Sequence, residues 1–385
     1  MFKLLLLSVD GTTIREYSGE AAKEVLRDPN RTGQLWLDIQ NQKQADIDLL
    51  AQVFKFHPLA LEDCLHFDQR AKLEEYSGTK PYLFIVTHNF VTMPVLPDGL
   101  MDSQDESSIH LPRHMLARGH NTTFALQVLE MHAFLGQGVL VTIHAEPNGA
   151  IDGVFQRVRH EPSLMLRGSD FVYYLIADAL CDSNFPVLEQ LSNLLDDLEG
   201  AILQTNSPDT GGKGVLTRRR APDDELKLSI YSLRKTLVRM RRAISPQRDV
   251  MGALFRHGGS PCIAERTAPY FRDIYDHLTR VYESIEAGRD LVSNCMDAYH
   301  STVSQYTNDI MKSLTMLSAF MLPMTFLTGF FGMNFDAMPF KSHVMFALSL
   351  LVMFAAVPAA MFWLFRRLEW LGEKPARKKP PRALT

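Results

Sequence analysis

The spacing of hydrophobic positions changes along the chain, and these changes divide it into segments. Short apolar or alternating runs predict β-strands, the last two arranged as a hairpin, at 34–41, 82–90, 124–135 and 138–144. Helical spacing between the first two strands predicts helices at 42–56 and 58–67. Residues 1–168 are therefore expected to form an α/β domain, interrupted at 97–122 by a polar stretch typical of a long loop or an insertion.

The first apolar run, Leu4 to Val9, allows two interpretations, a signal peptide and a β-strand. It is short for a signal peptide, and Asp10 and Gly11 follow it without a small-residue cleavage pattern. The sequence therefore favours a first strand.

Helical spacing without strand signals begins at residue 169. An acidic segment ends near residue 203, a Gly-, Pro- and Thr-rich break covers 205–224, and a basic segment follows. Opposite charges on consecutive helices favour an antiparallel hairpin over residues 169–268. A nucleic-acid-binding helix is the less favoured interpretation of the basic segment, because the acidic helix offers it a partner.

Two uncharged stretches near the C-terminus each exceed the roughly 20 apolar residues that cross a bilayer. Two buried helices of a soluble protein are the alternative, which the back-to-back arrangement of the stretches disfavours. Pro323 is the only proline between residues 270 and 331, so one stalk helix is expected to continue into the first span. This helix is expected at 269–334, with the first span at about 313–334. A loop at 335–342, a second span at 343–365 and a basic tail at 366–385 are expected to follow.

Basic residues predict the orientation of these spans. Lys312 precedes the first span, and the tail after the second span is rich in arginine and lysine, whereas the loop holds Lys341 against Asp336. The positive-inside rule then places both termini in the cytoplasm of a multi-pass protein of the cell (inner) membrane.

One face of the first span is smaller and more polar than the rest. It contains Asn308, Met311, Thr315, Ser318, Leu322, Thr325, Gly329 and Gly332, within about a third of the helix circumference at 100° per residue. We call this set the stripe. Small and polar residues in a span face other helices or water rather than lipid, so the stripe is either a packing seam or the lining of a conduit between several copies.

Composition narrows the function. The net charge of −4 over 385 residues gives no reason to expect a nucleic-acid partner. The four cysteines are far apart and form neither a zinc knuckle nor a disulfide framework. Scattered histidines, among them His57, His66, His88 and His144, are expected in the core or at the surface. No nucleophile–base pair, phosphate-binding loop or metalloenzyme motif is present, so neither an enzyme nor a cofactor is expected.

The sequence Gly332-Met333-Asn334 ends the first of the two expected C-terminal spans, LPMTFLTGFF precedes it, and FRDIYDH lies upstream. With these motifs, residues 269–340 resemble the CorA family of divalent-cation channels. The resemblance covers the chain except 97–122. It implies an α+β membrane protein that forms a funnel-shaped homopentamer, with five first spans lining a pore. It also implies passage of Mg²⁺, with Co²⁺ and Ni²⁺ as further candidates, down the electrochemical gradient.

The resemblance also implies roles for individual residues. A ring of Asn334 carboxamides, with Gly332 and Met333 beside it, would hold the hydrated ion, and Thr325 would contact its water. Apolar gates would be formed by Met311, Leu314 and Leu322. Asn308 would form a polar ring and Asp297 an acidic ring, and Asp336 would place a charge at the mouth of the pore.

Mg²⁺ is expected to be the regulatory ligand as well as the substrate. Asp273 matches the carboxylate of the family's regulatory site, and Asp98 or Asp102 would supply the second carboxylate. An ion pair of Asp273 with Arg272 or His277 is the simpler alternative.

Two alternatives to a magnesium channel stay open. The loop reads Met338-Pro339-Phe340-Lys341 where the family often has MPEL, which weakens the case for ion capture and selectivity. A zinc transporter of the ZntB type shares the fold, but Phe335 and Met338 favour the magnesium branch. A membrane-anchored scaffold or sensor without conduction is the second alternative, which the polar stripe disfavours.

Overall fold

The computed structural model describes residues 1–8, 10–11, 13–29, 31–94, 124–206, 224–333 and 343–367. Contacts divide the chain into two compact units. The first unit comprises Met1–Leu198 and Glu225–Asn294, and the second comprises Glu199–Asp224 and Cys295–Thr385. The predicted segment 97–122, the loop at 335–342 and the tail beyond residue 367 lie outside the described residues.

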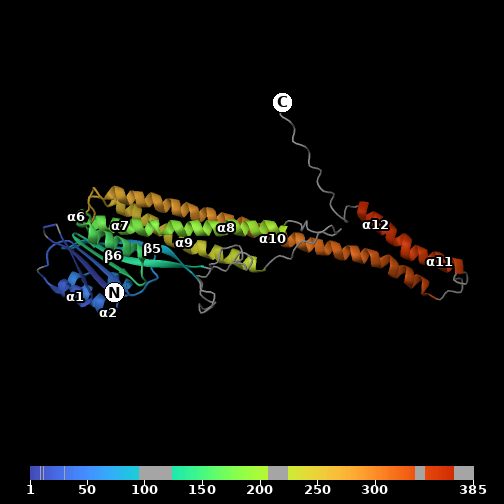
Figure 1. Ribbon diagram of the computed structural model, residues 1–385, viewed down its shortest axis with the longest axis horizontal. Coiled ribbons are helices and arrows are strands. Elements are labelled where there is room, and N and C mark those ends of the chain that lie inside the picture. The colour runs from blue at the N-terminus through green and yellow to red at the C-terminus, as the bar shows by residue number, and fades with distance from the viewer. Residues whose placement is uncertain are drawn as a thin grey trace, which may run out of the picture. The chain divides into compact units, whose positions relative to one another are not determined.

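A seven-stranded sheet is the centre of the first unit, in the order β2-β1-β3-β7-β6-β5-β4 (Figure 1). Strands β3 and β7 are parallel, and all other neighbours are antiparallel. The strands are β1 Phe2–Leu7, β2 Ile14–Ser18, β3 Leu35–Gln40, β4 Lys72–Tyr76, β5 Tyr82–Pro94, β6 Phe124–Gly136 and β7 Val139–His144. All five strands expected from the sequence are present, including the first, and β5 and β6 pair beyond the predicted ends.

Two strands and three helices were not expected. Strands β2 and β4 read IREYS and KLEEY, and these polar sequences lie at the two edges of the sheet, where an apolar pattern is not required. The additional helices are α1 Gly19–Arg27, α5 Gly149–His160 and α6 Pro162–Leu166.

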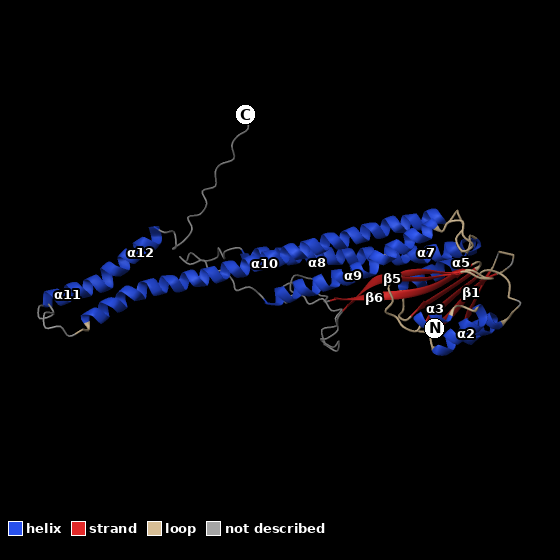
Figure 2. Cartoon of the chain, turned by 180° about the vertical axis from the view of Figure 1, so that it is seen from behind, coloured by secondary structure: helices blue, strands red, loops and turns tan. Residues whose placement is uncertain are grey.

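Helices cover both faces of the sheet (Figure 2). One face packs on α1, α2 Gln44–Phe54 and α3 Pro58–Asp63, with Leu37, Phe84, Phe134 and Val141 in its buried core. The other face packs on α5 and α7 Ser169–Asp182, where Trp36 contacts Phe155 at a ring-centroid distance of 5.2 Å. The expectation of an α/β domain is thus confirmed for the N-terminal part.

Long helices complete the described chain. They are α8 Asn184–Asn206, α9 Asp224–Arg256 and α10 Ala268–Phe331, the last confirming an uninterrupted helix that contains Pro323. The acidic segment is two helices rather than one, since α7 ends at Asp182. Gly288 of α10 lets three helices approach closely, because a Cβ there would lie 3.3 Å from Leu195 and 3.4 Å from Leu237. The basic helix α9 also pairs with α10, through Arg241 and Glu286 at 2.6 Å.

The helix after the loop differs from the expected regular span. It comprises α11 His343–Leu351, a π-helical segment Val352–Ala356 and α12 Val357–Arg367. Within the π-helical segment the N–H of Val357 bonds to the carbonyl of Val352. Pro358 follows directly, and because proline has no N–H and clashes with the carbonyl four residues before it, a wider turn relieves that clash.

Length and hydropathy identify one membrane-span candidate among the described residues, Ala268–Phe330, whose most apolar window is not buried. The interruption keeps each piece of the second helix below the length of a span. Two membrane spans therefore remain a proposal.

Candidate functional site

The stripe of α10 is uncovered in the single chain. All eight of its residues, from Asn308 to Gly332, are exposed, and Met311 and Leu322 are 57% and 74% exposed. Leu314, the third predicted gate residue, is 56% exposed. The sequence predicted a seam or a conduit, and the structure shows a face that nothing in its own chain covers among the described residues.

The opposite face of the same helix is partly covered. Its half-buried positions are Lys312, Met316, Ala319, Phe320, Pro323, Met324 and Leu327, roughly half a turn away from the stripe. Phe320 contacts Phe365 of α12 at 5.3 Å between ring centroids, and Phe365 is buried. The second unit thus uses one face of α10 for packing inside the chain and leaves the polar face available.

The hydroxyl of Thr325 donates a hydrogen bond to the carbonyl of Met321 at 2.9 Å. Its hydrogen is therefore used within the helix, while the hydroxyl oxygen keeps lone pairs that can accept a hydrogen bond from water. This arrangement suits contact with the water shell of a cation.

Helix α10 ends at Phe331, directly before the Gly-Met-Asn sequence. The N–H of Gly332 bonds to the carbonyl of Thr328 at 2.9 Å, and that of Met333 to Phe330 at 3.3 Å. Both residues are exposed. Asn334 and Asp336 lie outside the described residues, so the carboxamide ring and the mouth charge stay predictions.

Two predicted pore positions and the predicted sensor lie on exposed parts of α10. Asn308 and Asp297 are exposed, and the side chain of Asp273 is 60% accessible. Oδ1 of Asp273 lies 3.9 Å from Nε2 of His277, which is the contact that the sequence offered as the simpler alternative. Asp98 and Asp102, the expected second carboxylates, lie outside the described residues.

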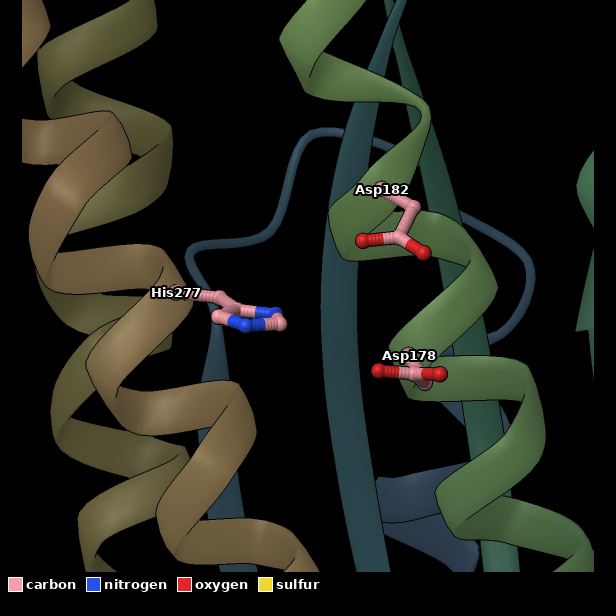
Figure 3. A group of neighbouring side chains, drawn as sticks. All are labelled: Asp178, Asp182 and His277. Atoms are coloured by element: carbon pink, nitrogen blue, oxygen red, sulfur yellow. The ribbon is translucent and has the colours of Figure 1, made fainter.

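Three side chains from α7 and α10 form a cluster near Asp273. Asp178 and Asp182 of α7 point toward His277 of α10 in Figure 3. One ligand atom of each residue lies within 4.8 Å of the other two. The two carboxylates lie one helical turn apart on the same face of α7. We call these three residues the acidic cluster.

The charges of the acidic cluster are unbalanced. Burial raises the pKa of Asp178, and the neighbouring Asp182 and Asp273 raise it further, while His277 acts in the opposite direction. A raised pKa means that the charged form of Asp178 is unfavourable in the folded protein, mainly through desolvation and carboxylate repulsion. A divalent cation bound here would cancel that repulsion, and carboxylate oxygens are the ligands that Mg²⁺ prefers.

Sequence reasoning missed this cluster. It counted Asp178 and Asp182 among the acids of an acidic helix and named His277 only as an alternative partner of Asp273, but the i, i+4 spacing of the two aspartates was a usable signal. His277 is distant in sequence from both aspartates, so its approach to α7 depends on helix packing that periodicity does not specify.

The four histidines singled out in the sequence are distributed as expected between core and surface. His57 and His66 are exposed, whereas His88 and His144 are buried. Burial alone would raise the pKa of Glu130 beside His88, but hydrogen bonds from His132 and His88 lower it to about 2. Oε1 of Glu130 lies 2.5 Å from Nε2 of His132, so these groups form a buried hydrogen-bonded network of the sheet.

Comparison with known proteins gives consistent results. Residues 99–367 match the family model described as "CorA-like Mg²⁺ transporter protein". The chain is 27% identical over 372 residues to the cobalt/magnesium transport protein CorA of Thermotoga maritima, covering 96% of this chain and 93% of that protein. It is 31% identical to the putative metal ion transporter YfjQ of Bacillus subtilis, over 79% of each chain.

A zinc transporter and a solved structure are also similar. Identity to the zinc transport protein ZntB of Klebsiella pneumoniae is 27%, covering 64% of this chain and 69% of that protein. The structure of the CorA magnesium transporter of Methanocaldococcus jannaschii matches with a TM-score of 0.71 at 20% identity, over 96% of this chain and 98% of that one.

Proposed function

The chain belongs to the family of CorA-like Mg²⁺ transporter proteins, and from this premise we propose that it conducts Mg²⁺ through a homopentameric pore in the cell membrane. Divalent metal transport is the activity of the family. The choice of Mg²⁺, with Co²⁺ and Ni²⁺ as further ions, and the assembly of five copies as a funnel with both termini in the cytoplasm are the steps proposed here.

The observation that carries the proposal is the uncovered stripe of α10. Packing inside the chain covers the opposite face, and a lipid-facing surface does not favour Thr, Ser, Asn and Gly at regular helical spacing. Identical copies that meet around an axis would cover the stripe of each α10 and leave a water-filled space between them.

In this pore, selection would occur at the end of α10. Mg²⁺ loses water reluctantly, so a ring of Asn334 carboxamides that accepts hydrogen bonds from bound water can hold the hydrated ion without stripping it. Thr325 would contact that water below the ring. Met311, Leu314 and Leu322 would form constrictions that close by excluding water. A membrane potential of 100 mV, negative inside, would favour entry of a divalent ion by about 4.6 kcal/mol.

The acidic cluster supports regulation by the transported ion. At high internal Mg²⁺ the cation would bind Asp178, Asp182 and the nearby Asp273, and it would stabilise the closed state by cancelling their repulsion. Loss of the ion would restore the repulsion and favour opening. Asp98 or Asp102 stays a prediction for a further carboxylate of this site.

Zinc is the second candidate ion. His277 adds a nitrogen ligand to the acidic cluster, and imidazole is a common zinc ligand, whereas Mg²⁺ favours oxygen. The similarity to a ZntB protein agrees with this alternative.

Ion flux into proteoliposomes tests the proposed function. Uptake of Mg²⁺, Co²⁺, Ni²⁺ and Zn²⁺ is compared between the wild type, Asn334→Ala and Thr325→Ala. We expect Mg²⁺ uptake to fall by at least about tenfold in Asn334→Ala and less in Thr325→Ala, since each loses an acceptor for ion-bound water. Thr328→Ala is the matched control, because Thr328 bonds to backbone carbonyls of the same helix but lies outside the stripe. Unchanged rates and ion preference in Asn334→Ala would refute the proposed ring.

A further inference from the structure

A buried histidine–carboxylate pair lies under helix α5, on the sheet face opposite α1 to α3. Nδ1 of His144 is 2.6 Å from the carbonyl oxygen of Glu146, and Nε2 is 3.3 Å from Oδ1 of Asp38. The two side chains are 5% and 3% exposed. Strands β3 and β7 are parallel neighbours and bring the two residues together from positions far apart in the sequence.

Both ring nitrogens of His144 face acceptors. A carbonyl oxygen only accepts, so Nδ1 carries a hydrogen. In neutral imidazole the lone pair of Nε2 would then face a carboxylate, and among the described residues this buried atom has no other polar partner. In the imidazolium form Nε2 carries a hydrogen as well, so the repulsive contact becomes an ion pair. The geometry therefore favours the protonated ring.

The surrounding charges act in the same direction. Burial opposes the charge on His144, but Asp38 and the Glu146 carbonyl outweigh it and raise the pKa of His144 above its ordinary value of 6.5. Asp152 of α5 contributes at longer range, although its carboxylate is paired with Lys3 of β1 at 2.6 Å. Asp38 also accepts a hydrogen bond from Thr142 at 2.6 Å, which fixes the carboxylate in place.

This pair holds the turn that leads from β7 into α5. Nδ1 of the His144 ring donates a hydrogen bond to the carbonyl of Glu146 within the turn. The backbone carbonyl of His144 accepts a hydrogen bond from the N–H of Asn41 at 2.9 Å. Asn148 then caps α5 through the N–H of Ala150. Helix α5 packs on α7, which carries Asp178 and Asp182.

We propose that Asp38 and His144 form a proton-operated latch that fixes the β7–α5 turn, and that loss of the proton loosens helices α5 and α7 and weakens cation binding at the acidic cluster. The second step rests on the proposed function of that cluster. Because the pKa of folded His144 is raised, the stabilisation is fully present below the unfolded value and is lost as pH rises through the folded value. The latch thus makes the cation site weaker in an alkaline cytoplasm.

Hydrogen exchange of the full chain in detergent tests the latch itself. Protection of residues 145–160 is compared between the wild type and His144→Gln at each pH from about 6 to 9, so that the intrinsic pH dependence cancels. We expect wild-type protection to exceed that of His144→Gln by about tenfold at the acidic end, and this ratio to approach one at the alkaline end.

Two further variants keep the latch test decisive. Asp38→Asn removes the carboxylate while keeping its shape, and it should abolish the pH dependence even if His144→Gln fails to fold. His160→Gln is the control, because His160 is exposed on the same helix α5. If the wild type and Asp38→Asn lose protection to the same extent as pH rises, the latch is overturned.

A second measurement separates the latch from the function of the cluster. The Mg²⁺ concentration that half-protects the full chain from limited proteolysis is determined at both ends of the pH range. We expect a higher concentration at alkaline pH in the wild type and no shift in Asp38→Asn. If the wild type shows no shift although the exchange result holds, the coupling to the cluster is refuted. If Asp178→Asn needs the same Mg²⁺ concentration as the wild type, the proposed role of the cluster fails while the latch stands.

Discussion

At the scale of single residues, carboxylate repulsion is the physical basis of the proposed regulation. Asp178, Asp182 and Asp273 lie near one another, and His277 and Arg157 offset their repulsion only in part. Groups that repel in the absence of a ligand store free energy that binding of a divalent cation releases. The amino-acid types at these positions therefore say more about ion sensing than about stability.

Asp178→Asn should stabilise the cation-free protein. The pKa of Asp178 is raised in the folded state, so its contribution to stability falls as pH rises through that value, and the neutral amide removes this loss. We expect a higher midpoint of thermal unfolding than the wild type without Mg²⁺ at neutral pH, and a smaller increase when Mg²⁺ is added.

Differential scanning fluorimetry with and without Mg²⁺ measures both effects. Glu189→Gln is the control, because Glu189 is an exposed acid on α8 outside the acidic cluster. Equal Mg²⁺-induced shifts in the wild type and Asp178→Asn would contradict the assignment.

Individual site residues were only partly predictable. Asp273 was identified because its surrounding motif resembles a family, and it does lie beside the acidic cluster. His277 was named only as an alternative partner of Asp273, and that contact exists at 3.9 Å, but its ring also faces Asp178 and Asp182. A residue can belong to two interactions at once, and sequence spacing on one helix shows only the local one.

At the scale of elements, helix α10 has two faces with different roles. Its covered face packs against Phe365, while its stripe is exposed along the whole apolar part. A helix with one face used inside its own chain and a second face free is suited to assembly with copies of itself.

Leu322→Ser should open the proposed gate. A hydroxyl at this constriction favours water where leucine excludes it, so we expect Mg²⁺ leak at high internal Mg²⁺ to rise by about tenfold or more. Leu317→Ser is the matched control, since Leu317 is also exposed (57%) on α10 but lies outside the stripe. Flux assays in proteoliposomes loaded with Mg²⁺ compare the two, and equal leak would count against Leu322 as a gate.

The elements were predictable where their pattern is dictated by burial. Strands β3 and β7 lie inside the sheet, and their sequences LWLDIQ and VLVTIH are apolar at most positions, so their positions followed from the sequence. The edge strands β2 and β4 are polar because solvent accepts their side chains, and no apolar pattern marks them. The uninterrupted α10 followed from the near absence of proline, since other residues permit a long helix.

At the scale of the whole molecule, the proposal depends on five copies around one axis. The sequence carries this only through its resemblance to a family, because no periodicity within one chain encodes a copy number. Native mass spectrometry in detergent should give a mass of five chains, and a population of monomers or dimers would contradict the pore.

Thr325→Cys should form crosslinks between copies more readily than Thr328→Cys, because only Thr325 lies on the stripe.

The π-helical segment Val352–Ala356 has a consequence for everything that follows it. A π-helical turn absorbs one surplus residue, so the positions of α12 are offset by about 100° from the helical wheel of α11. Arg367, which lies 5.3 Å from the Trp363 ring, therefore has a position around the helix that depends on the π-helical segment more than two turns before it. Removing a single residue from this segment would restore a regular α-helix on one helical wheel and leave that cation–aromatic pair in place.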